Sequence, residues 1–318
     1  MNAPIIFIHY NDSKYLKFSL ILAKKNNPNE DVILLGDKSN EHYKNLGIKH
    51  AYFIEYFNGV NYLNFEESFE YIVGNNFENV TYGKPWTKFN FNKYFALFNY
   101  LKSEQIEKFW TFDSDVFIFS ELKPFEEQFK DFNYTSWNYI HQLQGFSDIT
   151  LIEKYCRFLY DIFKNKSFIN EQKEDFKKNP NYGFTLMRAF KKFKEDLNLN
   201  VINIFDEAYN SYHGLFCHYF VVDNFINDKY YKTIHDSTNL LKKQLYINRF
   251  GQFFVQNVNN RTYQPIAVLD TSWLNYYVQK KIFKICLNHK QEFTGYKKFS
   301  YSISPIEKIL NKIKKVFA

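Results

Sequence analysis

The sequence predicts an α/β fold with a mostly parallel central sheet flanked by helices. In the N-terminal part of the 318-residue chain, short apolar segments rich in strand formers alternate with segments of helical period. Strand, helix and strand in close succession form a βαβ unit, which implies parallel strands and right-handed crossovers. A further buried strand follows a long helical segment near residue 110, and no internal repeat or low-complexity linker interrupts the chain.

The N-terminal elements follow from the apolar runs and the turn formers between them. We expect strands at residues 4–9, 31–35 and 51–55, and helices at residues 15–25 and 40–46. In parallel sheets of this kind, ligands bind beyond the carboxyl ends of the strands. His9 and Tyr10 after the first strand, and Asp37 after the second, are therefore expected at a ligand-binding edge; ordinary loop residues are the alternative.

A long helix leads into the strand around which the rest of the chain is organised. From Phe91 to Leu101 apolar side chains recur with helical spacing, and Lys88 and Lys93 flank the start of this helix. The stretch 109–119 is then apolar, aromatic and β-branched on both sides of two carboxylates, which predicts a buried strand.

The second half of the chain is expected to mix helices and strands. Helices are predicted at 149–163 and 184–197, strands at 137–145, 201–205, 246–258 and 266–269, and a hairpin turn at 249–252. Residues 164–181 are polar and show no apolar period, so we expect a solvated loop there. The alternative for this stretch is a mobile lid over a substrate.

Composition and charge exclude some classes of protein. The formal net charge of +7 is modest and diffuse, so no nucleic-acid partner is expected. The three cysteines lie far apart in the sequence and are expected as reduced core thiols. The chain shows no secretion signal and no apolar run of the ~20 residues that span a bilayer, so a cytoplasmic location is expected.

Asp113 and Asp115 are the main candidates for chemistry. Burying ionised carboxylates beside an apolar strand costs several kcal/mol each unless they are paired or bind a cation. Residues i and i+2 of an extended segment point to the same side, so the two carboxylates are expected to converge on one ion. Such hard oxygen ligands suit Mg²⁺ or Mn²⁺, which share a substrate's phosphates; a solvated surface turn is the alternative.

The order of these elements resembles that of GT-A glycosyltransferases, the nucleotide-sugar transferases, over residues 4–285. The most specific part is residues 88–119, which look like the helix, strand and carboxylate block of bacterial polysaccharide glycosyltransferases. The resemblance implies one GT-A-like domain at 1–295. Within it, residues 1–120 would bind the nucleotide sugar and residues 121–295 the acceptor.

The resemblance also implies roles for single residues. Asp113 and Asp115 match the metal and diphosphate motif, with Asp115 the firmer metal ligand and Asp113 nearer the ribose or a metal-bound water. Asp37 matches a position that contacts the base or ribose, and Tyr10 matches loop packing around the base. Lys88 or Lys93 would meet phosphate or ribose oxygens; a solvated lysine is the alternative. The implied donor is a nucleoside-diphosphate sugar, with a UDP-sugar favoured.

The catalytic base is expected among the acidic residues of the acceptor half. Asp206 and Glu207, after the strand at 201–205, are the first candidates, with Asp206 preferred; an acid at a helix N-terminus is the alternative. Asp270, after the strand at 266–269, is the next, as a base or an extra metal ligand. No C-terminal histidine motif of the retaining families is present in the sequence, which leaves the stereochemistry open.

Two other functions remain open from the sequence. A phosphatase resembling the haloacid dehalogenases would use Asp113 as its nucleophile, but its motif normally stands near the N-terminus and needs a second acidic loop. A non-catalytic module that binds glycan or nucleic acid would need clustered basic and stacking side chains. Most aromatic residues here instead follow the spacing of a core.

The C-terminal tail at 296–318 is expected to be basic and amphipathic. Ser304-Pro305-Ile306-Glu307 forms a capping box, and apolar residues with helical spacing follow among four lysines. Through residues 304–318 the protein is expected to reach an anionic membrane surface, at the inner face of the cytoplasmic membrane. A final helix docked on the domain is the alternative. The implied substrates are a sugar nucleotide and a glycan acceptor of bacterial surface-polysaccharide assembly.

Overall fold

A computed structural model describes residues 3–77, 83–136, 142–204, 215–218, 231–235, 241–272, 274–288 and 294–301. The chain forms two compact units that are interleaved along the sequence. The first unit contains residues 1–12, 29–114 and 123–204, and the second contains residues 13–28, 115–122 and 205–318. Among the described residues, no helix has both the length and the apolar character needed to cross a bilayer.

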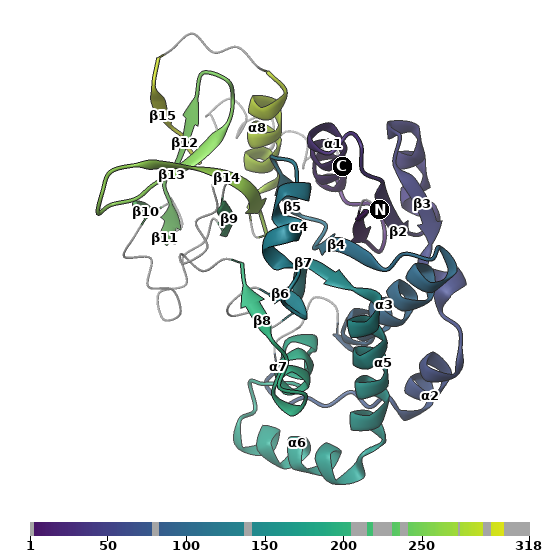
Figure 1. Cartoon of the computed structure of the whole chain (residues 1–318). Coiled ribbons are helices and arrows are strands. Elements are labelled where there is room, and N and C mark those ends of the chain that lie inside the picture. The colour runs from purple at the N-terminus through teal and green to yellow at the C-terminus, as the bar shows by residue number, and fades with distance from the viewer. Residues whose placement is uncertain are drawn as a thin grey trace, which may run out of the picture. The chain divides into compact units, whose positions relative to one another are not determined.

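The first unit contains a mixed but mostly parallel sheet of seven strands (Figure 1). Its order is β3-β2-β1-β4-β7-β6-β8, and only β7 runs against its neighbours. The strands are β1 (Ile5–Ile8), β2 (Val32–Gly36), β3 (Lys49–Tyr52), β4 (Lys108–Phe112), β6 (Tyr134–Ser136), β7 (Leu143–Asp148) and β8 (Val201–Asn203). The mixed α/β class predicted from the sequence is therefore confirmed.

The first unit contains α-helices and 3-10 helices, most of which contribute buried residues to one core with the sheet. They are α2 (Val60–Ser68), α3 (Gly83–Ser103), α4 (Lys123–Phe129), α5 (Ile149–Lys164), α6 (Lys166–Lys178) and α7 (Leu186–Asp196), with the 3-10 helices η1 (Lys38–Leu46) and η2 (Phe53–Tyr56). Phe91 and Phe95 of α3 and Phe163 of α5 are almost completely buried there. The helical period from Phe91 predicted α3 correctly, although the helix begins at Gly83.

Residues 164–181 differ from their prediction, because most of them form the helix α6 and not a loop. Asn165 caps this helix by accepting a hydrogen bond from the backbone N–H of Phe168 at 3.1 Å. Phe168, Ile169 and Phe176 are buried in the core of the unit. Three of the thirteen residues of α6 are apolar, and many charged residues lie between them. The helical spacing of apolar residues is therefore weak, and the sequence pattern did not predict the helix.

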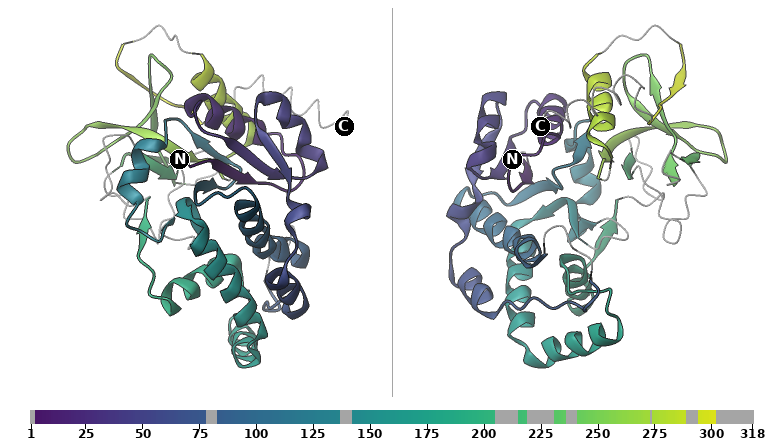
Figure 2. Two further views of the ribbon diagram at one scale, coloured as in Figure 1. Left: turned by 45° about the vertical axis from the view of Figure 1, so that its right-hand side comes forward. Right: turned by 180° about the vertical axis from the view of Figure 1, so that it is seen from behind.

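The second unit is built on a six-stranded sheet that contains residues from widely separated parts of the chain (Figure 2). The order β15-β12-β13-β14-β5 is antiparallel, and β9 pairs with β14 in parallel. These strands are β5 (Val116–Ile118), β9 (Leu215–His218), β12 (Leu245–Asn248), β13 (Phe253–Gln256), β14 (Tyr263–Asp270) and β15 (Tyr296–Lys298). A separate two-stranded ladder joins β10 (Thr233–His235) and β11 (Leu241–Lys243).

Two helices, α1 (Leu16–Asn26) and α8 (Tyr276–Leu287), pack in the second unit. Phe18 of α1 stacks on Phe283 of α8 with ring centroids 4.6 Å apart, and it meets Phe117 of β5 edge-on. The predicted turn at 249–252 is confirmed between β12 and β13. Helix α1 therefore joins β1 and β2 in the chain while its side chains build the core of the second unit.

The stretch 109–119 contains two short strands, each in a different sheet. β4 ends at Phe112, and β5 begins at Val116 and pairs with β14. The strand expected at 51–55 lies earlier in the chain, because β3 covers Lys49–Tyr52 and η2 begins at Phe53. Residues 137–141, Phe205 and the tail at 302–318 belong to predicted elements but lie outside the described residues.

Candidate functional site

The candidate site of the first unit lies at the carboxyl ends of β1 and β4, where the strand order reverses. From β1 the chain continues to β2 and β3 on one side, and β4 then pairs with β1 on the other side. In open α/β sheets such a topological switch point leaves a crevice that binds ligands. His9 and Tyr10 follow β1, and Asp113 follows β4, so these residues meet at this edge.

Asn40 joins the loops that follow β1 and β2. Its side-chain amide donates to the backbone carbonyls of His9 (3.2 Å) and Asn11 (2.8 Å), and its Oδ1 accepts from the backbone N–H of Asp37 (3.0 Å). The ring Nε2 of His50 also lies 2.8 Å from this oxygen. Asn40 is fully buried. A Cβ at Gly36 would lie 2.0 Å from Oδ1 of Asn40, so this position requires glycine.

Asp37 is held as a carboxylate at the N-terminus of η1. It accepts hydrogen bonds from the backbone N–H of Ser39 (2.8 Å), the hydroxyl of Ser39 (2.5 Å) and the backbone N–H of Asn11 (2.5 Å). Burial raises the pKa of Asp37, but these hydrogen bonds outweigh it and leave the pKa below its usual value. The side chain is therefore an ionised acceptor at the end of β2.

His9 is a neutral imidazole at the end of β1. Burial lowers the pKa of His9 to about 4, although Asp37 and Asp12 raise it in part. Its Nδ1 lies 2.8 Å from Oγ of Ser114, which follows Asp113 in the chain. This hydrogen bond links the loop after β1 to the loop after β4, so the two loops hold each other in place.

Asp113 is held by two buried glutamines, Gln144 of β7 and Gln142 directly before that strand. Oε1 of Gln144 accepts from the backbone N–H of Asp113 (3.0 Å), and the amide of Gln142 donates to its Oδ2 (2.8 Å). Nζ of Lys93 lies 3.6 Å from Oδ1, next to a cavity of about 10 Å³, of the order of one water molecule. The side chain of Asp113 nevertheless stays 44% exposed. A fixed carboxylate thus faces solvent beside a lysine.

The structure separates the two lysine candidates on α3. Lys93 lies beside Asp113, and its side chain is only 13% exposed. Lys88 instead pairs with Glu66 at 2.6 Å, and Asn92 donates to the other oxygen of the same carboxylate. Lys88 therefore supports the contact between α2 and α3, and Lys93 is the lysine of the candidate site.

Tyr10 lies on an aromatic surface at the end of β1. Its ring is 6.1 Å from that of Phe53 and 5.6 Å from that of Phe89, and Trp86 stacks on Phe89. Tyr10 is 50% exposed. A half-exposed ring that also contacts two other rings offers an aromatic surface on which a planar group can stack.

The acidic candidates Asp115 and Asp270 belong to the second unit. The backbone carbonyl of Asp115 accepts a 3.2 Å hydrogen bond from the backbone N–H of Thr271. Asp270 is cross-strand partner of Val116, and its buried carboxylate accepts from the backbone N–H (2.6 Å) and hydroxyl (2.5 Å) of Ser272. Asp115 and Asp270 thus lie on paired segments of one sheet. Asp206 and Glu207 lie outside the described residues.

The carboxylates fit a hard divalent cation in donor type. Within the described ranges, no three His, Cys, Asp or Glu side chains gather into a complete protein cage. Mg²⁺ and Mn²⁺ need no such cage, because they bind through one or two carboxylates together with water and substrate phosphates. Asp113 offers one such carboxylate in the first unit, and Asp115 follows two residues later in the second unit.

Sequence reasoning missed Asn40, Gln142 and Gln144. The position of Asn40 three residues after the helix cap Asp37 is a detectable signal, because it completes a capping box. The sequence around Gln142 and Gln144 shows no pattern that indicates their contacts with Asp113. Their role depends on the antiparallel pairing of β7 with β4, which aligns Gly145 with Thr111.

No protein-family model matches the sequence, and no curated protein matches it significantly. The site at the ends of β1 and β4 is therefore interpreted from the residues and contacts of this chain alone.

Proposed function

We propose that the protein is a metal-dependent GT-A-like glycosyltransferase. It would move a sugar from a nucleoside-diphosphate sugar, with a UDP-sugar favoured, to a glycan or lipid-linked glycan acceptor. The observation that carries this proposal is the state of Asp113. The buried amide of Gln142 donates to its carboxylate and that of Gln144 accepts from its backbone N–H, and yet the side chain stays 44% exposed at the switch point. Such support is expected for a group that must meet a ligand from a fixed direction.

The neighbouring side chains suit the parts of a sugar nucleotide. The exposed ring of Tyr10 offers a stacking surface for the base. The ionised carboxylate of Asp37 can accept hydrogen bonds from ribose hydroxyls or a base N–H. Lys93 provides a positive charge beside Asp113, where the diphosphate would bind.

Asp113 and Asp115 would hold Mg²⁺ or Mn²⁺ together with the diphosphate. When bound, the cation stabilises the negative charge that develops on the leaving nucleoside diphosphate. Lys93 would add to that stabilisation from the side of α3. Proton removal from the acceptor hydroxyl would fall to Asp206, Glu207 or Asp270, of which Asp270 is held in one orientation by Ser272.

The proposal is tested by thermal unfolding with UDP, other nucleoside diphosphates and their sugar derivatives, with and without Mn²⁺. A ligand at 100 times its dissociation constant stabilises the folded state by about 2.7 kcal/mol, so one nucleotide should raise the melting temperature by several degrees only when Mn²⁺ is present. Asp113→Asn and Asp115→Asn should each abolish the increase. Asp131→Asn, at an exposed position of the same unit, should keep it.

Two results would contradict the proposal. If no nucleotide stabilises the wild-type protein, the site does not bind a sugar nucleotide. If the protein releases phosphate from simple phosphoesters and Asp113→Asn prevents this, Asp113 is the nucleophile of a phosphatase.

A further inference from the structure

Positive charge is concentrated in the C-terminal part of the chain. Residues 241–318 contain 14 Lys and Arg against 3 Asp and Glu, a net charge of +11. Residues 1–240 contain 27 against 31, a net charge of −4. Such asymmetry within one chain points to an anionic partner of the basic part. Most of this basic part belongs to the described residues of the second unit, so its surface can be analysed.

The turn between β12 and β13 presents an exposed aromatic ring together with a basic group. Phe250 is 53% exposed, and the guanidinium of Arg249 lies 4.6 Å from the centre of its ring. Gly251 follows with a φ of +75°, and a Cβ there would lie 2.5 Å from the backbone oxygen of Ile285. The turn is therefore fixed against the C-terminal end of α8, and Phe250 stays exposed because the backbone holds it there.

Further apolar and basic side chains surround this turn. The turn, the C-terminal end of α8 and the start of β15 lie at the same end of the second unit (Figure 1). Leu287 of α8 is 38% exposed, and Tyr296 of β15, the cross-strand partner of Asn248, is 44% exposed. Lys284 of α8 and Lys297 of β15 are also exposed. We call Arg249, Phe250, Lys284, Leu287, Tyr296 and Lys297 the basic apolar end.

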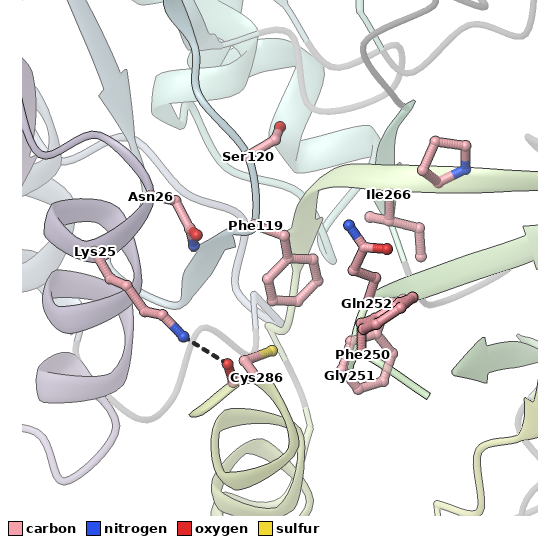
Figure 3. Close-up of a pocket in the computed structure, with 11 residues that line it drawn as sticks. Lys25, Asn26, Phe119, Ser120, Phe250, Gly251, Gln252, Ile266 and Cys286 are labelled. Atoms are coloured by element: carbon pink, nitrogen blue, oxygen red, sulfur yellow. Dashed lines mark hydrogen bonds between the residues drawn. The ribbon is translucent and has the colours of Figure 1, made fainter. Parts of the chain in front are cut away.

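A cavity of about 490 Å³ opens beside the basic apolar end (Figure 3). Phe119, Phe250 and Phe253 supply aromatic walls, and Lys25 is the one charged side chain that lines the cavity in the described part of the chain. Nζ of Lys25 donates to the backbone carbonyl of Cys286 at 2.7 Å. Burial raises the pKa of Cys286 to about 12, so its thiol is neutral.

We propose that the basic apolar end docks on an anionic membrane surface. Phe250 and Leu287 would enter the interfacial region, where aromatic and apolar side chains are favourable. Arg249, Lys284 and Lys297 would face the lipid phosphates, each contributing ~1 kcal/mol of attraction. This inference is independent of glycosyl transfer.

The side chains favour a membrane over a nucleic acid. Nucleic-acid surfaces use aromatic rings that stack on bases and basic groups that follow the phosphates. Leu287 has no ring that could stack on a base. If this surface bound a nucleic acid, the exposed Leu287 side chain would stay in contact with water. At the headgroup boundary the same side chain is buried.

The experiment is flotation of the full chain with vesicles of phosphatidylcholine alone or mixed equally with phosphatidylglycerol. We expect binding only to the anionic vesicles. Arg249→Ser should lower the partition coefficient about fivefold, the effect of ~1 kcal/mol. The double variant R249S/F250S should lower it by more than about tenfold. Far-ultraviolet circular dichroism verifies that each variant is folded.

Two controls separate this surface from general attraction. Arg261→Ser removes one exposed charge from the turn at the opposite end of β13, and it should have a smaller effect than Arg249→Ser. Replacing Lys308, Lys312, Lys314 and Lys315 by serine removes positive charge from the tail, which lies outside the described residues. The remaining binding to vesicles should still depend on Phe250. Equal effects of Arg249→Ser and Arg261→Ser would overturn the proposal. Binding of R249S/F250S to anionic vesicles at the wild-type level would also overturn it. So would binding to an oligonucleotide that is tighter than binding to the vesicles and does not depend on Phe250.

Discussion

The side chain of Asn40 joins two loops that follow parallel strands, and it fills its hydrogen-bonding capacity in doing so. It donates to one loop and accepts from the other, and no part of it is exposed. Asp37 and Asn11, which it holds, also contact each other directly. The ligand edge of the first unit is therefore organised by a residue that need not touch a ligand.

Asn40→Ala should destabilise the protein by about 3 kcal/mol. The substitution removes the hydrogen bonds of a buried amide to the carbonyls of His9 and Asn11 and to the backbone N–H of Asp37, and each such hydrogen bond contributes about 1 kcal/mol. Urea unfolding followed by circular dichroism measures the change. The matched control is Asn58→Ala, where an exposed amide donates to the carbonyl of Glu55, and a change of about 1 kcal/mol or less is expected. Equal costs at both positions would refute the role given to Asn40.

Some site residues could be predicted from the sequence, and others could not. Tyr10, Asp37 and Asp113 were predictable because each directly follows an apolar run, and parallel strands bring their carboxyl ends to one edge. Gln142 and Gln144 were not, because their contacts depend on the register of an antiparallel partner strand. A strand's own residues do not reveal which strand it will pair with.

Among the helices, α3 shows how spacing assigns different tasks to similar residues. Lys88 and Lys93 are five positions apart, which turns them about 140° from each other around an α-helix. Lys88 consequently pairs with Glu66 of α2, while Lys93 lies beside Asp113. From the sequence both flank the start of the helix and are equivalent candidates; the positions of α2 and β4 distinguish them.

Lys93→Met should weaken the binding of a Mn²⁺–nucleoside diphosphate by about tenfold, whereas Lys88→Met should change it less than about twofold. A charge-assisted hydrogen bond to phosphate contributes about 1.5–3 kcal/mol, and Lys93 is the lysine at the candidate diphosphate position. Isothermal titration calorimetry with UDP measures both affinities. A larger loss in Lys88→Met than in Lys93→Met would reverse this assignment.

At the scale of the whole molecule, the sequence predicted the parallel sheet but not the interleaving of two units. Apolar runs and helical periods are local, so β1, β2 and β4 were expected close to their positions. The partners of β5 come from far along the chain, and α1 packs with α8 in the second unit. Such pairings depend on contacts between residues that are distant in sequence, which no local pattern encodes.

The stability of the protein should fall between about pH 6.5 and pH 4, and His9 should contribute to the loss. Burial lowers the pKa of His9 from 6.5 to about 4, so in this range the unfolded chain binds a proton that the folded protein does not. The stabilisation is complete above pH 6.5 and decreases as the pH falls, by about 3 kcal/mol at pH 4. Urea unfolding as a function of pH measures this slope.

His9→Gln should flatten the slope, because it removes the titrating ring and keeps a side chain able to meet Ser114. The difference between wild type and variant isolates His9 from the carboxylates that titrate in the lower part of the range. An unchanged slope in His9→Gln would mean that His9 binds its proton equally well in the folded and unfolded states. The hydrogen bond between the loops after β1 and β4 would then not depend on a neutral ring.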